Sequence, residues 1–570
     1  VGSEMCIRDR FIDHGEGTEN VAWSSENIMA TQKVLYKGHA VAAVAAIDRY
    51  VADYAASKVK VEYDLLDAVT NVEDATKEGA PILLDSLVGD HLGKKVKNTN
   101  VASITRHEFG DPDKAFANAE NVVERTFTLQ MVHQGYIEPH NATAHWDEED
   151  RIKVWTSTQG AFPVRTSTAA ILKLDVSRVK VTPLEIGGGF GGKIPVYLEP
   201  VVSILSRKSG RPVKAVMERS SVFQASGPAP GGTITVKMGT DKDANIVAAE
   251  SSIKLEAGGF PGSAVGAAVQ CIFAAYDIPN TRIDGFDIVV NKPKSAAYRA
   301  PGSPQAAFAT ETVSDELARI HGMDPIDFRL QNASKEGTRR ADGVVFPKVG
   351  NVEVLEAAKK SDHWNSDLGT PAKGRVRGRG VASGYWFNVG LKSTVNLSVN
   401  SDGSVVLVEG SSDIGGTRTS ISMQAAEILG IEVENFRPSV GDTETAGYAD
   451  VTGGSRTTYA TGFAAVKAAE NLIEVLKDRC AIIWSLDKND IDFEDGTFFA
   501  SKDPELKFTF KELASNLDNT GGPAASSGSV DLESAGGAFG THIVDVDVDT
   551  ETGKTDIARY TVLQLSLIHI

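Results

Sequence analysis

The stretch from Gly187 to Lys193 reads Gly-Gly-Gly-Phe-Gly-Gly-Lys and is well suited to holding a ligand with its backbone. A segment with so few side chains can take positive φ angles and bring its N–H groups close to an anion or a cofactor. Its spacing fits both the dinucleotide pattern G-x-G-x-x-G and the P-loop pattern. However, Ile194 stands where a P-loop needs Ser or Thr, and the loop follows a long β-rich region instead of opening a βαβ unit. A pocket for another kind of cofactor and a turn with only a packing role are the remaining interpretations.

Five further polar, turn-rich loops interrupt apolar segments, at 155–160, 297–305, 411–417, 453–458 and 536–540. Such loops offer backbone N–H groups together with amide, hydroxyl and guanidinium side chains. This set of groups suits a large polar cofactor that carries phosphate and ring heteroatoms. Each loop alone is a weak signal, so their order along the chain matters more than any one of them.

Length and composition exclude several classes of protein. A chain of 570 residues predicts three or four domains, and a formal charge of −18 argues against binding to a nucleic-acid backbone. The three cysteines, Cys6, Cys271 and Cys480, match no zinc, iron–sulfur or disulfide pattern, and the last two are predicted to be core residues. We predict a reducing, cytoplasmic location, with the periplasm as the alternative. No apolar run is long enough for a spanning helix.

The elements that must position these loops predict an α+β fold. Residues 11–85 are predicted to contain a small α/β unit, with strands at 31–36 and 59–63 and a helix at 49–58. Residues 86–104 are polar and lack periodicity, which predicts a linker. The next two regions, 105–345 and 370–564, each combine strands, glycine-rich turns and helices.

Two later segments carry clear patterns. Residues 306–321 predict an amphipathic helix with Glu311 among its polar positions. Residues 543–549 alternate strictly, which predicts a strand with Asp545, Asp547 and Asp549 on one solvated face.

Four motifs, taken in order, resemble the molybdenum-cofactor-binding large subunit of the xanthine dehydrogenase and aldehyde oxidase family of molybdenum hydroxylases. They are Ser-Thr-Gln at 157–159, the glycine loop at 187–193, Tyr-Arg-Ala-Pro-Gly at 298–302 and Thr-Gly-Gly-Ser-Arg at 452–456. The resemblance implies a hammerhead α/β domain over 11–85. It also implies two large α+β cofactor domains, at 105–345 and 370–564.

The resemblance implies roles for single residues. The Gln159 amide would bond an oxygen ligand of molybdenum, and the backbone N–H groups of Phe190 and Gly191 would face the metal. Arg299 would stand beside the metal as a catalytic and cofactor-binding residue. The further cofactor-binding positions are Gly189, Gly454, Ser455 and Arg456. No protein side chain would ligate molybdenum, because the dithiolene of molybdopterin supplies sulfur.

The resemblance also implies a substrate pocket, and departures from the family pattern narrow the substrate class. The pocket residues would be Glu138, Ile194, Ala267, Ala300 and Pro301. Purine oxidisers of the family carry glutamate and arginine where Ile194 and Ala267 stand, so a purine is not expected. CO dehydrogenases carry cysteine in place of Ala300, so CO is not expected, and an aldehyde or an aromatic heterocycle is predicted. Gly416 replaces a glutamine that contacts the pterin in relatives.

By the same resemblance, the general base would be a glutamate in a segment that follows Gln564, so we expect this polypeptide to be inactive alone. Residues 1–10 and 565–570 resemble translated vector sequence, and we expect the natural chain to extend beyond both. The cofactor implied is molybdopterin with molybdenum, in the cytosine dinucleotide form, and water would be the oxygen donor. Iron–sulfur clusters and FAD would lie on a small and a medium partner subunit, in a dimer of heterotrimers.

Less specific interpretations stand beside these. A nucleotide-binding enzyme that uses 187–193 and a non-catalytic scaffold both remain alternatives. Glu138 and His140 invite a metal interpretation, but their spacing to His133 and His145 matches no zinc motif, so structural or pocket-wall roles are preferred. Arg299 could instead be an ordinary buried ion-pair partner of an acid such as Glu311.

Overall fold

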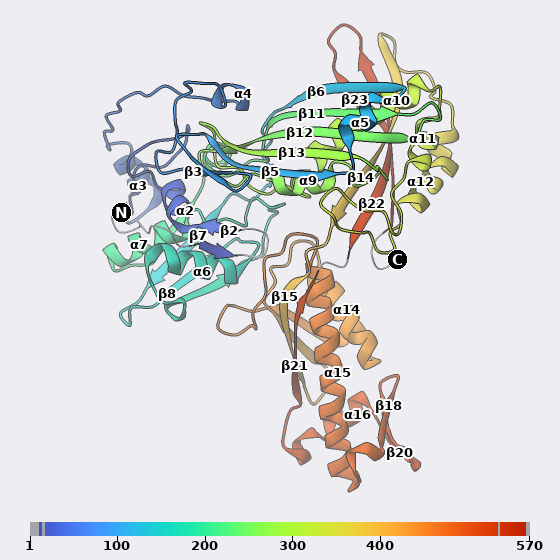
Figure 1. Ribbon diagram of the computed structural model, residues 1–570. Helices are drawn as coiled ribbons and strands as arrows, with labels where there is room; N and C mark the ends of the chain where they lie inside the picture. Colours follow the sequence, from blue (N-terminus) through green and yellow to red (C-terminus); the bar gives the residue numbers. More distant parts are fainter. Residues whose placement is uncertain (1–10, 14–17, 534–535, 566–570) are drawn as a thin grey trace.

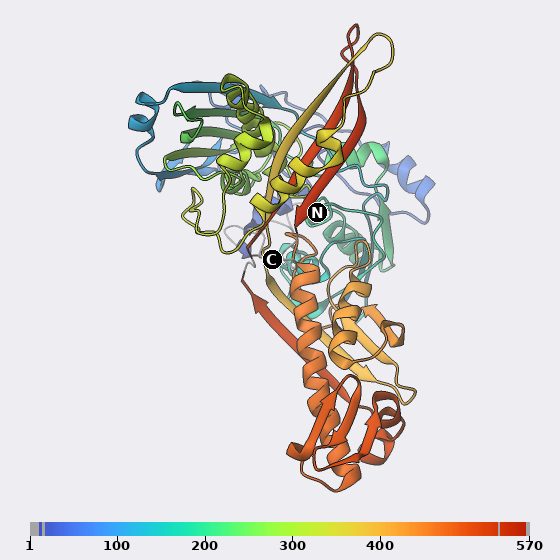
Figure 2. The same ribbon diagram turned by 90° about the vertical axis from the view of Figure 1, so that its right-hand side faces the viewer.

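The computed structural model describes residues 11–13, 18–533 and 536–565. Figure 1 shows a broad upper part, built from a long sheet and a smaller α/β layer beside it, and a narrow lower part that projects away. In Figure 2 the lower part extends in one direction and a strand hairpin rises in the other. Within the described ranges, no helix has the length and apolar character needed to cross a membrane. Helices and strands are mixed in the way the predicted α+β class requires.

The N-terminal region contains few paired strands. It consists of β1 (Phe11–Asp13), β2 (Thr18–Asn20), α2 (Val21–Ile28), α3 (Arg49–Ala56) and α4 (Val72–Ala75). The helix predicted at 49–58 is confirmed, but the strands predicted at 31–36 and 59–63 are wrong. Alternation makes 59–63 compatible with a strand, yet a strand also needs a neighbour for its N–H and C=O groups. No described strand pairs with either segment.

The largest sheet has the order β4-β3-β5-β13-β12-β11-β6. Its strands are β3 (Val88–His91), β4 (Lys94–Lys97), β5 (Val101–Phe109), β6 (Asn121–Leu129), β11 (Gly232–Thr240), β12 (Ile246–Gly258) and β13 (Thr281–Val289). Helices α9 (Val265–Cys271) and α10 (Ser303–Ile320) share its apolar core, and α5 (Pro112–Ala117) connects β5 to β6. Cys271 lies in this core and Cys480 in that of the lower part, as predicted.

Residues 86–104 are not a linker, because β3, β4 and the start of β5 fall inside them. Strands β3 and β4 pair as a hairpin, and β3 also pairs with β5. Strand β4 forms the edge of the sheet and carries three lysines. Edge strands are commonly charged because their outer side faces water, so polar composition here did not signal a loop.

The smaller layer holds the loops at 155–160 and 187–193. Its sheet has the order β10-β7-β8-β9, made of β7 (Asn141–Trp146), β8 (Ile152–Thr156), β9 (Val179–Pro183) and β10 (Val213–Val216). Its helices are α6 (Ala161–Leu172), α7 (Glu199–Ser209) and α8 (Arg219–Ala225). Helix α6 begins at Ala161, directly after the loop at 155–160. The short loop before it is therefore fixed between a core strand and a largely buried helix.

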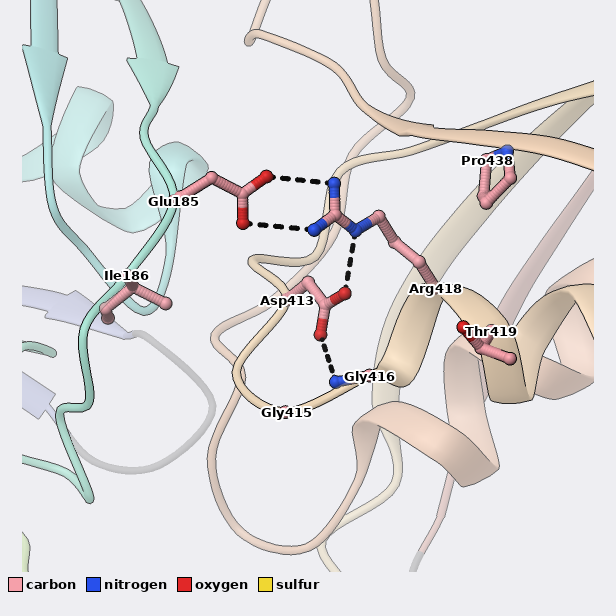
Figure 3. A pocket seen from close by; sticks show the side chains of 8 residues that line it. All are labelled: Glu185, Ile186, Asp413, Gly415, Gly416, Arg418, Thr419 and Pro438. Carbon is pink, nitrogen blue, oxygen red and sulfur yellow. Dashed lines mark hydrogen bonds and ion pairs between the residues drawn. The ribbon is translucent and has the colours of Figure 1, made fainter.

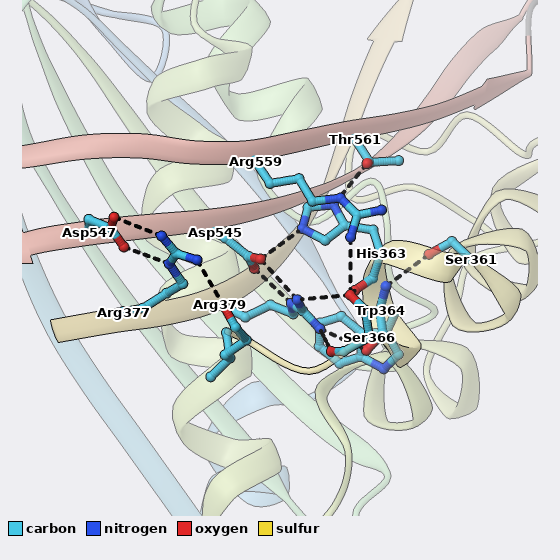
Figure 4. A network of polar contacts seen from close by, with 11 residues as sticks. Ser361, His363, Trp364, Ser366, Arg377, Arg379, Asp545, Asp547, Arg559 and Thr561 are labelled. Carbon is cyan, nitrogen blue, oxygen red and sulfur yellow. Dashed lines mark hydrogen bonds and ion pairs between the residues drawn. The ribbon is translucent and has the colours of Figure 1, made fainter. Parts of the chain in front are cut away.

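A second sheet in the upper part joins distant segments, with β14 (Arg375–Phe387), β22 (Gly537–Asp549) and β23 (Thr555–Leu565) in antiparallel order. Figure 4 shows Arg377 facing Asp547 and Arg379 facing Asp545 across two of these strands. The expected solvated aspartate face is therefore wrong, since the Asp545 side chain is only 5% exposed and pairs with Arg379 at 2.7 Å. Alternation predicts which residues share a face, but the partner strand decides what that face meets.

Helix α10 confirms the amphipathic segment at 306–321, but Glu311 lies on its buried side. Arg329 of α11 (Pro325–Gln331) donates to Glu311 at 2.8 Å, and the Tyr276 hydroxyl donates to it at 2.6 Å. The carboxylate is buried because α11 folds back and supplies a cation. Helices α12 (Asn351–Lys360) and α13 (Asp362–Asn365) follow, and α12 contacts β22.

The lower part is built on the sheet β17-β16-β15-β21. These strands are β15 (Leu391–Val399), β16 (Val405–Glu409), β17 (Phe436–Val440) and β21 (Ala525–Leu532). Helices α14 (Thr417–Leu429) and α15 (Thr457–Trp484) form its apolar core with the sheet. A small sheet of β18 (Ile491–Glu494), β19 (Thr497–Ala500) and β20 (Asp503–Thr509), with α16 (Phe510–Ser515), lies at the far end of α15 in Figure 1.

Candidate functional site

Gln159 is the point at which loops from distant parts of the chain meet. Its side chain is buried, and its N–H donates to the carbonyl oxygen of Lys193 at 3.0 Å. Its own carbonyl accepts the N–H of Thr452 at 2.8 Å, and the next residue, Gly160, forms a bridge with Ser411. The loops predicted from sequence at 155–160, 187–193 and 411–417, and the turn that begins at Thr452, are therefore brought together.

The Gln159 amide is held from both sides. Its Oε1 accepts the N–H groups of Gly191 at 2.8 Å and Lys193 at 3.2 Å, and its Nε2 donates to the Thr452 carbonyl at 2.8 Å. The Gly191 N–H, which was predicted to face the metal, therefore has a hydrogen-bond partner inside the protein. Phe190 and Gly191 were both predicted to direct an N–H group at the metal. Of these two, only the Phe190 N–H has no hydrogen-bond partner among the described residues.

The glycine loop is packed too closely for larger residues. A Cβ atom at Gly189 would lie 2.5 Å from Gln159 Oε1, and one at Gly191 would lie 2.4 Å from the Ala297 carbonyl oxygen. Phe190 itself has a φ of 54° and is 42% exposed, so its ring forms part of the accessible rim. Glycine is needed here because the backbone of one loop touches the side chain or backbone of the next.

Glu138, predicted to line the substrate pocket, has its carboxylate occupied by the glycine loop instead. Its Oε2 accepts from the Gly187 N–H, the Ser157 hydroxyl and the Lys193 ammonium, each at 2.6 Å. Burial raises the pKa of Glu138, but these hydrogen bonds outweigh it and leave the pKa below its ordinary value. Burial also lowers the pKa of Lys193, and Glu138 opposes that shift. The preference for a structural role at this position is thereby supported.

The histidines near Glu138 form a structural network. The Tyr136 hydroxyl lies 2.7 Å from His140 Nε2 and 3.0 Å from Ser226 Oγ, and His133 Nε2 lies 2.9 Å from the same Ser226 oxygen. Burial lowers the pKa of His140 to about 3 and that of His133 to about 4, so both rings are neutral near pH 7. In the part of the chain that the structure describes, no group of three ligand-type side chains could hold a metal ion.

The loop at 297–305 reaches the glycine loop through main-chain contacts. The Arg299 N–H donates to the Phe190 carbonyl at 2.8 Å. The Arg299 side chain is exposed, and within the described ranges it makes no ion pair, so the proposed pairing with Glu311 is wrong. The turn that contains Ala300 and Pro301 packs on helix α9, which carries Ala267, because Gly302 lies against the first turn of that helix. Ile194 directly follows Lys193, and its N–H donates to the Gly191 carbonyl at 3.4 Å.

The turn at 452–456 leads into helix α15. The Arg456 side chain is fully buried and donates to the carbonyl oxygens of Gly390 at 2.8 Å and Lys392 at 2.7 Å. Its guanidinium therefore holds the main chain together. At Gly454 and Ser455 the carbonyl oxygens are also bonded inside the protein, so the backbone N–H groups are the candidate contacts to a cofactor. Asn388 connects this turn to the predicted loop at 536–540. Its side chain donates to the Ser455 carbonyl and its N–H donates to the Gly536 carbonyl.

A pocket of about 450 Å³ opens between the two halves of the site. It is lined by Glu185, Ile186, Asp413, Gly415, Gly416, Arg418, Thr419 and Pro438, which Figure 3 shows. Arg418 donates to Asp413 at 2.7 Å and pairs with Glu185 of the preceding domain at 2.9 Å. Asp413 in turn accepts the N–H groups of Gly416 and Thr417, at the first turn of α14.

Several buried polar groups lie in or next to the loops of the site. Among the described residues, the hydroxyls of Ser412 and Thr457 and both carboxyl oxygens of Glu409 have no hydrogen-bond partner. Ser412 and Thr457 lie inside two of the predicted loops and Glu409 lies just before one of them, but none of the three was predicted to be a site residue. The first turn of α15 adds backbone N–H groups, and helix N-termini favour phosphate, whereas the N-terminus of α14 is already capped by Asp413. This donor set fits a phosphorylated heterocyclic cofactor.

The geometry argues against a nucleotide site on the glycine loop. Helix α7 begins at Glu199, several residues after Lys193, so the glycines do not open a helix as a dinucleotide fold requires. The Lys193 ammonium is paired with Glu138 and its side chain is fully buried, so it cannot reach a bound phosphate as a P-loop lysine would. The motif pattern alone suggests that Lys193 binds phosphate, but in the structure Lys193 holds the loops of the site together.

Comparison with protein families matches most of the chain. The family described as molybdopterin cofactor-binding domain matches residues 93–333, and a second family with the same description matches 354–564. The aldehyde oxidase and xanthine dehydrogenase a/b hammerhead domain matches residues 9–67. The match that begins at 93 includes part of the stretch predicted to be a linker.

Two curated relatives and one solved structure illustrate the likeness. The chain is 31% identical to the nicotinate dehydrogenase large molybdopterin subunit of Eubacterium barkeri over 360 residues, which cover 62% of this chain and 82% of that protein. It is 28% identical to the xanthine dehydrogenase molybdenum-binding subunit of Escherichia coli, over 95% of this chain and 73% of the relative. Quinoline 2-oxidoreductase from Pseudomonas putida 86 shares the fold, with a TM-score of 0.84 at 22% identity over 98% of this chain and 74% of that one.

Proposed function

This chain belongs to the xanthine dehydrogenase and aldehyde oxidase family of molybdenum hydroxylases, as a molybdenum-binding large subunit, and on that premise we propose that it oxidises an aldehyde or an aromatic heterocycle with water as the oxygen donor. The observation that carries the proposal is the meeting of loops from both cofactor-binding domains at Gln159. Fixed backbone donors and unpartnered hydroxyls surround that meeting point.

Molybdopterin fits this donor set, and we infer the cytosine dinucleotide form. When bound, the molybdenum centre would supply the two-electron redox chemistry. The Gln159 amide and the Phe190 N–H would orient the metal end, because both are fixed by hydrogen bonds or main-chain contacts. The polar remainder would be held by the backbone of Gly454 and Ser455, the Ser412 and Thr457 hydroxyls and the first turn of α15.

The substrate class is inferred from the residues that the family resemblance places in the substrate pocket. Ile194, Ala267, Ala300 and Pro301 bring neither charge nor hydrogen-bonding side chain to this region. A purine would leave several ring atoms unpaired in such a pocket, whereas an aldehyde or a small aromatic ring would lose little. Arg299 is exposed and anchored through its backbone to Phe190, so it is the candidate donor to a substrate carbonyl or ring nitrogen.

Electrons must leave through partners, so the proposal includes an iron–sulfur small subunit and an FAD-binding medium subunit in a dimer of heterotrimers. The general base is assigned, by family resemblance, to a glutamate of a segment that follows Gln564. The two described cysteines are free and buried, which is compatible with the cytoplasm, and the periplasm is the alternative compartment.

The test uses the complete multisubunit enzyme. Molybdenum and pterin are quantified per large subunit, and a panel of aldehydes, N-heterocycles, purines and CO is assayed in ¹⁸O-labelled water. We expect molybdenum near one atom per chain, label in the product, and turnover of an aldehyde or a heterocycle. A preference for purines or CO would contradict the substrate proposal. A correctly folded complex without molybdenum would point to a scaffold instead.

A further inference from the structure

One carboxylate oxygen joins both ends of the glycine loop. Glu138 Oε2 accepts the N–H of Gly187, the first loop residue, and the ammonium of Lys193, the last one, each at 2.6 Å. The Glu138 N–H also donates back to the Gly187 carbonyl at 3.3 Å. The two ends of the seven-residue loop are thus held together by one carboxylate oxygen, and Glu138 itself lies outside the strands of the sheets.

We propose that Glu138 and Lys193 are the positioning pair of the cofactor loop, and that they set the direction of the Gln159 amide and the Phe190 N–H. This inference rests on the proposed function, because it assigns these two groups to the cofactor. Neither charged side chain is expected to touch the substrate, so both are positioning residues.

The contacts that transmit this effect run through Lys193. Its ammonium binds Glu138 and also donates to the Ser157 hydroxyl at 2.9 Å. Its backbone exchanges two hydrogen bonds with Gln159, one from the Lys193 N–H to Oε1 and one from the Gln159 N–H to the Lys193 carbonyl. Moving the Lys193 side chain therefore moves the amide whose other end holds Thr452.

Burial makes the pair difficult to break without rearrangement. The Lys193 side chain is 0% exposed and that of Glu138 is 27% exposed. An ammonium left without its partner at such a depth must find another acceptor or move toward water. Because Lys193 is the last residue of the loop, either response displaces the loop itself.

A second lysine–glutamate pair supplies a matched control. Lys292 donates to both carboxyl oxygens of Glu256 at 2.8 Å, and the Glu256 side chain is 4% exposed. This pair lies in the same cofactor domain, and its described hydrogen bonds reach no residue of 187–193. It should contribute to stability without controlling the loop.

The test compares Glu138→Gln and Lys193→Met with Glu256→Gln and Lys292→Met in the complete multisubunit enzyme. Molybdenum per chain, amide hydrogen exchange over 187–193, the thermal midpoint, and KM and kcat are measured for each. In the first two variants we expect loop exchange about tenfold faster, a matching fall in molybdenum content, and a larger effect on kcat than on KM. Lys193→Arg keeps the cation and should recover most of the molybdenum content.

Equal exchange and equal molybdenum content in the loop variants and the wild type would overturn the inference. Equal losses in the control pair would also overturn it, because the Glu138–Lys193 pair would then be an ordinary structural ion pair. A wild-type complex without molybdenum would contradict the proposed function instead. In that case the exchange comparison would still show whether the pair holds the loop.

Discussion

Glu409 lies at the end of β16 with its side chain fully buried, and neither carboxyl oxygen has a partner among the described residues. Burial raises its pKa to about 8, and the charge of Asp413 adds to the shift, while Arg418 and Arg456 oppose it. The acid is therefore protonated at neutral pH in the folded protein and ionised in the unfolded chain.

This difference predicts a pH dependence of stability. Between pH 4.5 and 8 the folded state keeps a proton that the unfolded state has lost, so the free energy of unfolding falls as pH rises, by up to about 1.4 kcal/mol per unit. We expect Glu409→Gln to remove this loss, with a thermal midpoint that exceeds that of the wild type increasingly from pH 5 to pH 8. Glu356→Gln, at an exposed position of α12, is the control. Parallel midpoint curves for wild type and Glu409→Gln would contradict the assignment.

Gly189 gives a second prediction at the scale of the residue. In Gly189→Ala the new methyl group would lie 2.5 Å from Gln159 Oε1, so either the loop or the amide must move. We expect a stability loss of about 1–3 kcal/mol, typical of overpacking, together with lower molybdenum content in the complete enzyme. Gly378→Ala is the matched control, because its Cβ would meet nothing within 4 Å. A variant with normal molybdenum content would show that the amide position is not critical.

At the scale of the element, the facing arginines of β14 and aspartates of β22 differ in burial. Arg379 and Asp545 are 11% and 5% exposed, and His363 also approaches Asp545 at 3.2 Å, whereas Arg377 and Asp547 are 22% and 15% exposed. Figure 4 shows the two pairs side by side on the same pair of strands. The strands are thus joined by one deeply buried ion pair and one that is closer to water.

Replacing the aspartate of each ion pair should show that the buried pair contributes more to stability than the exposed one. Asp545→Ala leaves a buried guanidinium unpaired, which typically costs about 3–5 kcal/mol, whereas Asp547→Ala should cost about 1 kcal/mol or less. Denaturant unfolding of both variants at low and high salt tests this, and only the Asp547 effect should shrink clearly with salt. Equal losses for the two variants would refute the ranking.

At the scale of the whole molecule, the site is shared between the upper and lower parts. Gln159 and Thr452, Gly160 and Ser411, and Glu185 and Arg418 link them across the pocket, and the Thr443 N–H donates to Val181. These links are mostly hydrogen bonds and exposed ion pairs. A cofactor bound between the parts would therefore contribute a large share of their coupling.

Cofactor removal should consequently loosen the junction more than either part. A ligand at 1,000 times its Kd stabilises the folded state by about 4 kcal/mol. Protein made in a host that cannot synthesise molybdopterin should melt at a lower temperature than the loaded protein. It should also exchange amides faster at 411–417 and 452–457, while 491–509 at the far end remains unchanged. Uniform exchange changes across all three segments would contradict a site at the junction.

Much of the site was predictable from local sequence, because glycine-rich loops such as 187–193 and the turn at 452–456 are encoded by residue types that permit close backbone approach. Their order along the chain predicted the family and the α+β class, and the long strands and helices followed from periodicity. Residues 86–104 show the limit, because an edge strand and a polar linker share the same composition.

Only the tertiary structure decided which polar groups are hydrogen-bonded inside the protein and which remain available to a ligand. Glu138 and Arg456 are charged residues in polar motifs. Nothing local indicates that Glu138 would hold a loop, or that Arg456 would hold the buried main chain of two segments, 390–392 and 450–451. Likewise, the face of Asp545 was fixed by Arg379, which lies 166 residues away. The physical reason is that a polar group is satisfied by whatever the fold brings within hydrogen-bonding distance. The sequence determined the loops and the family, and only the folded chain determined the partners.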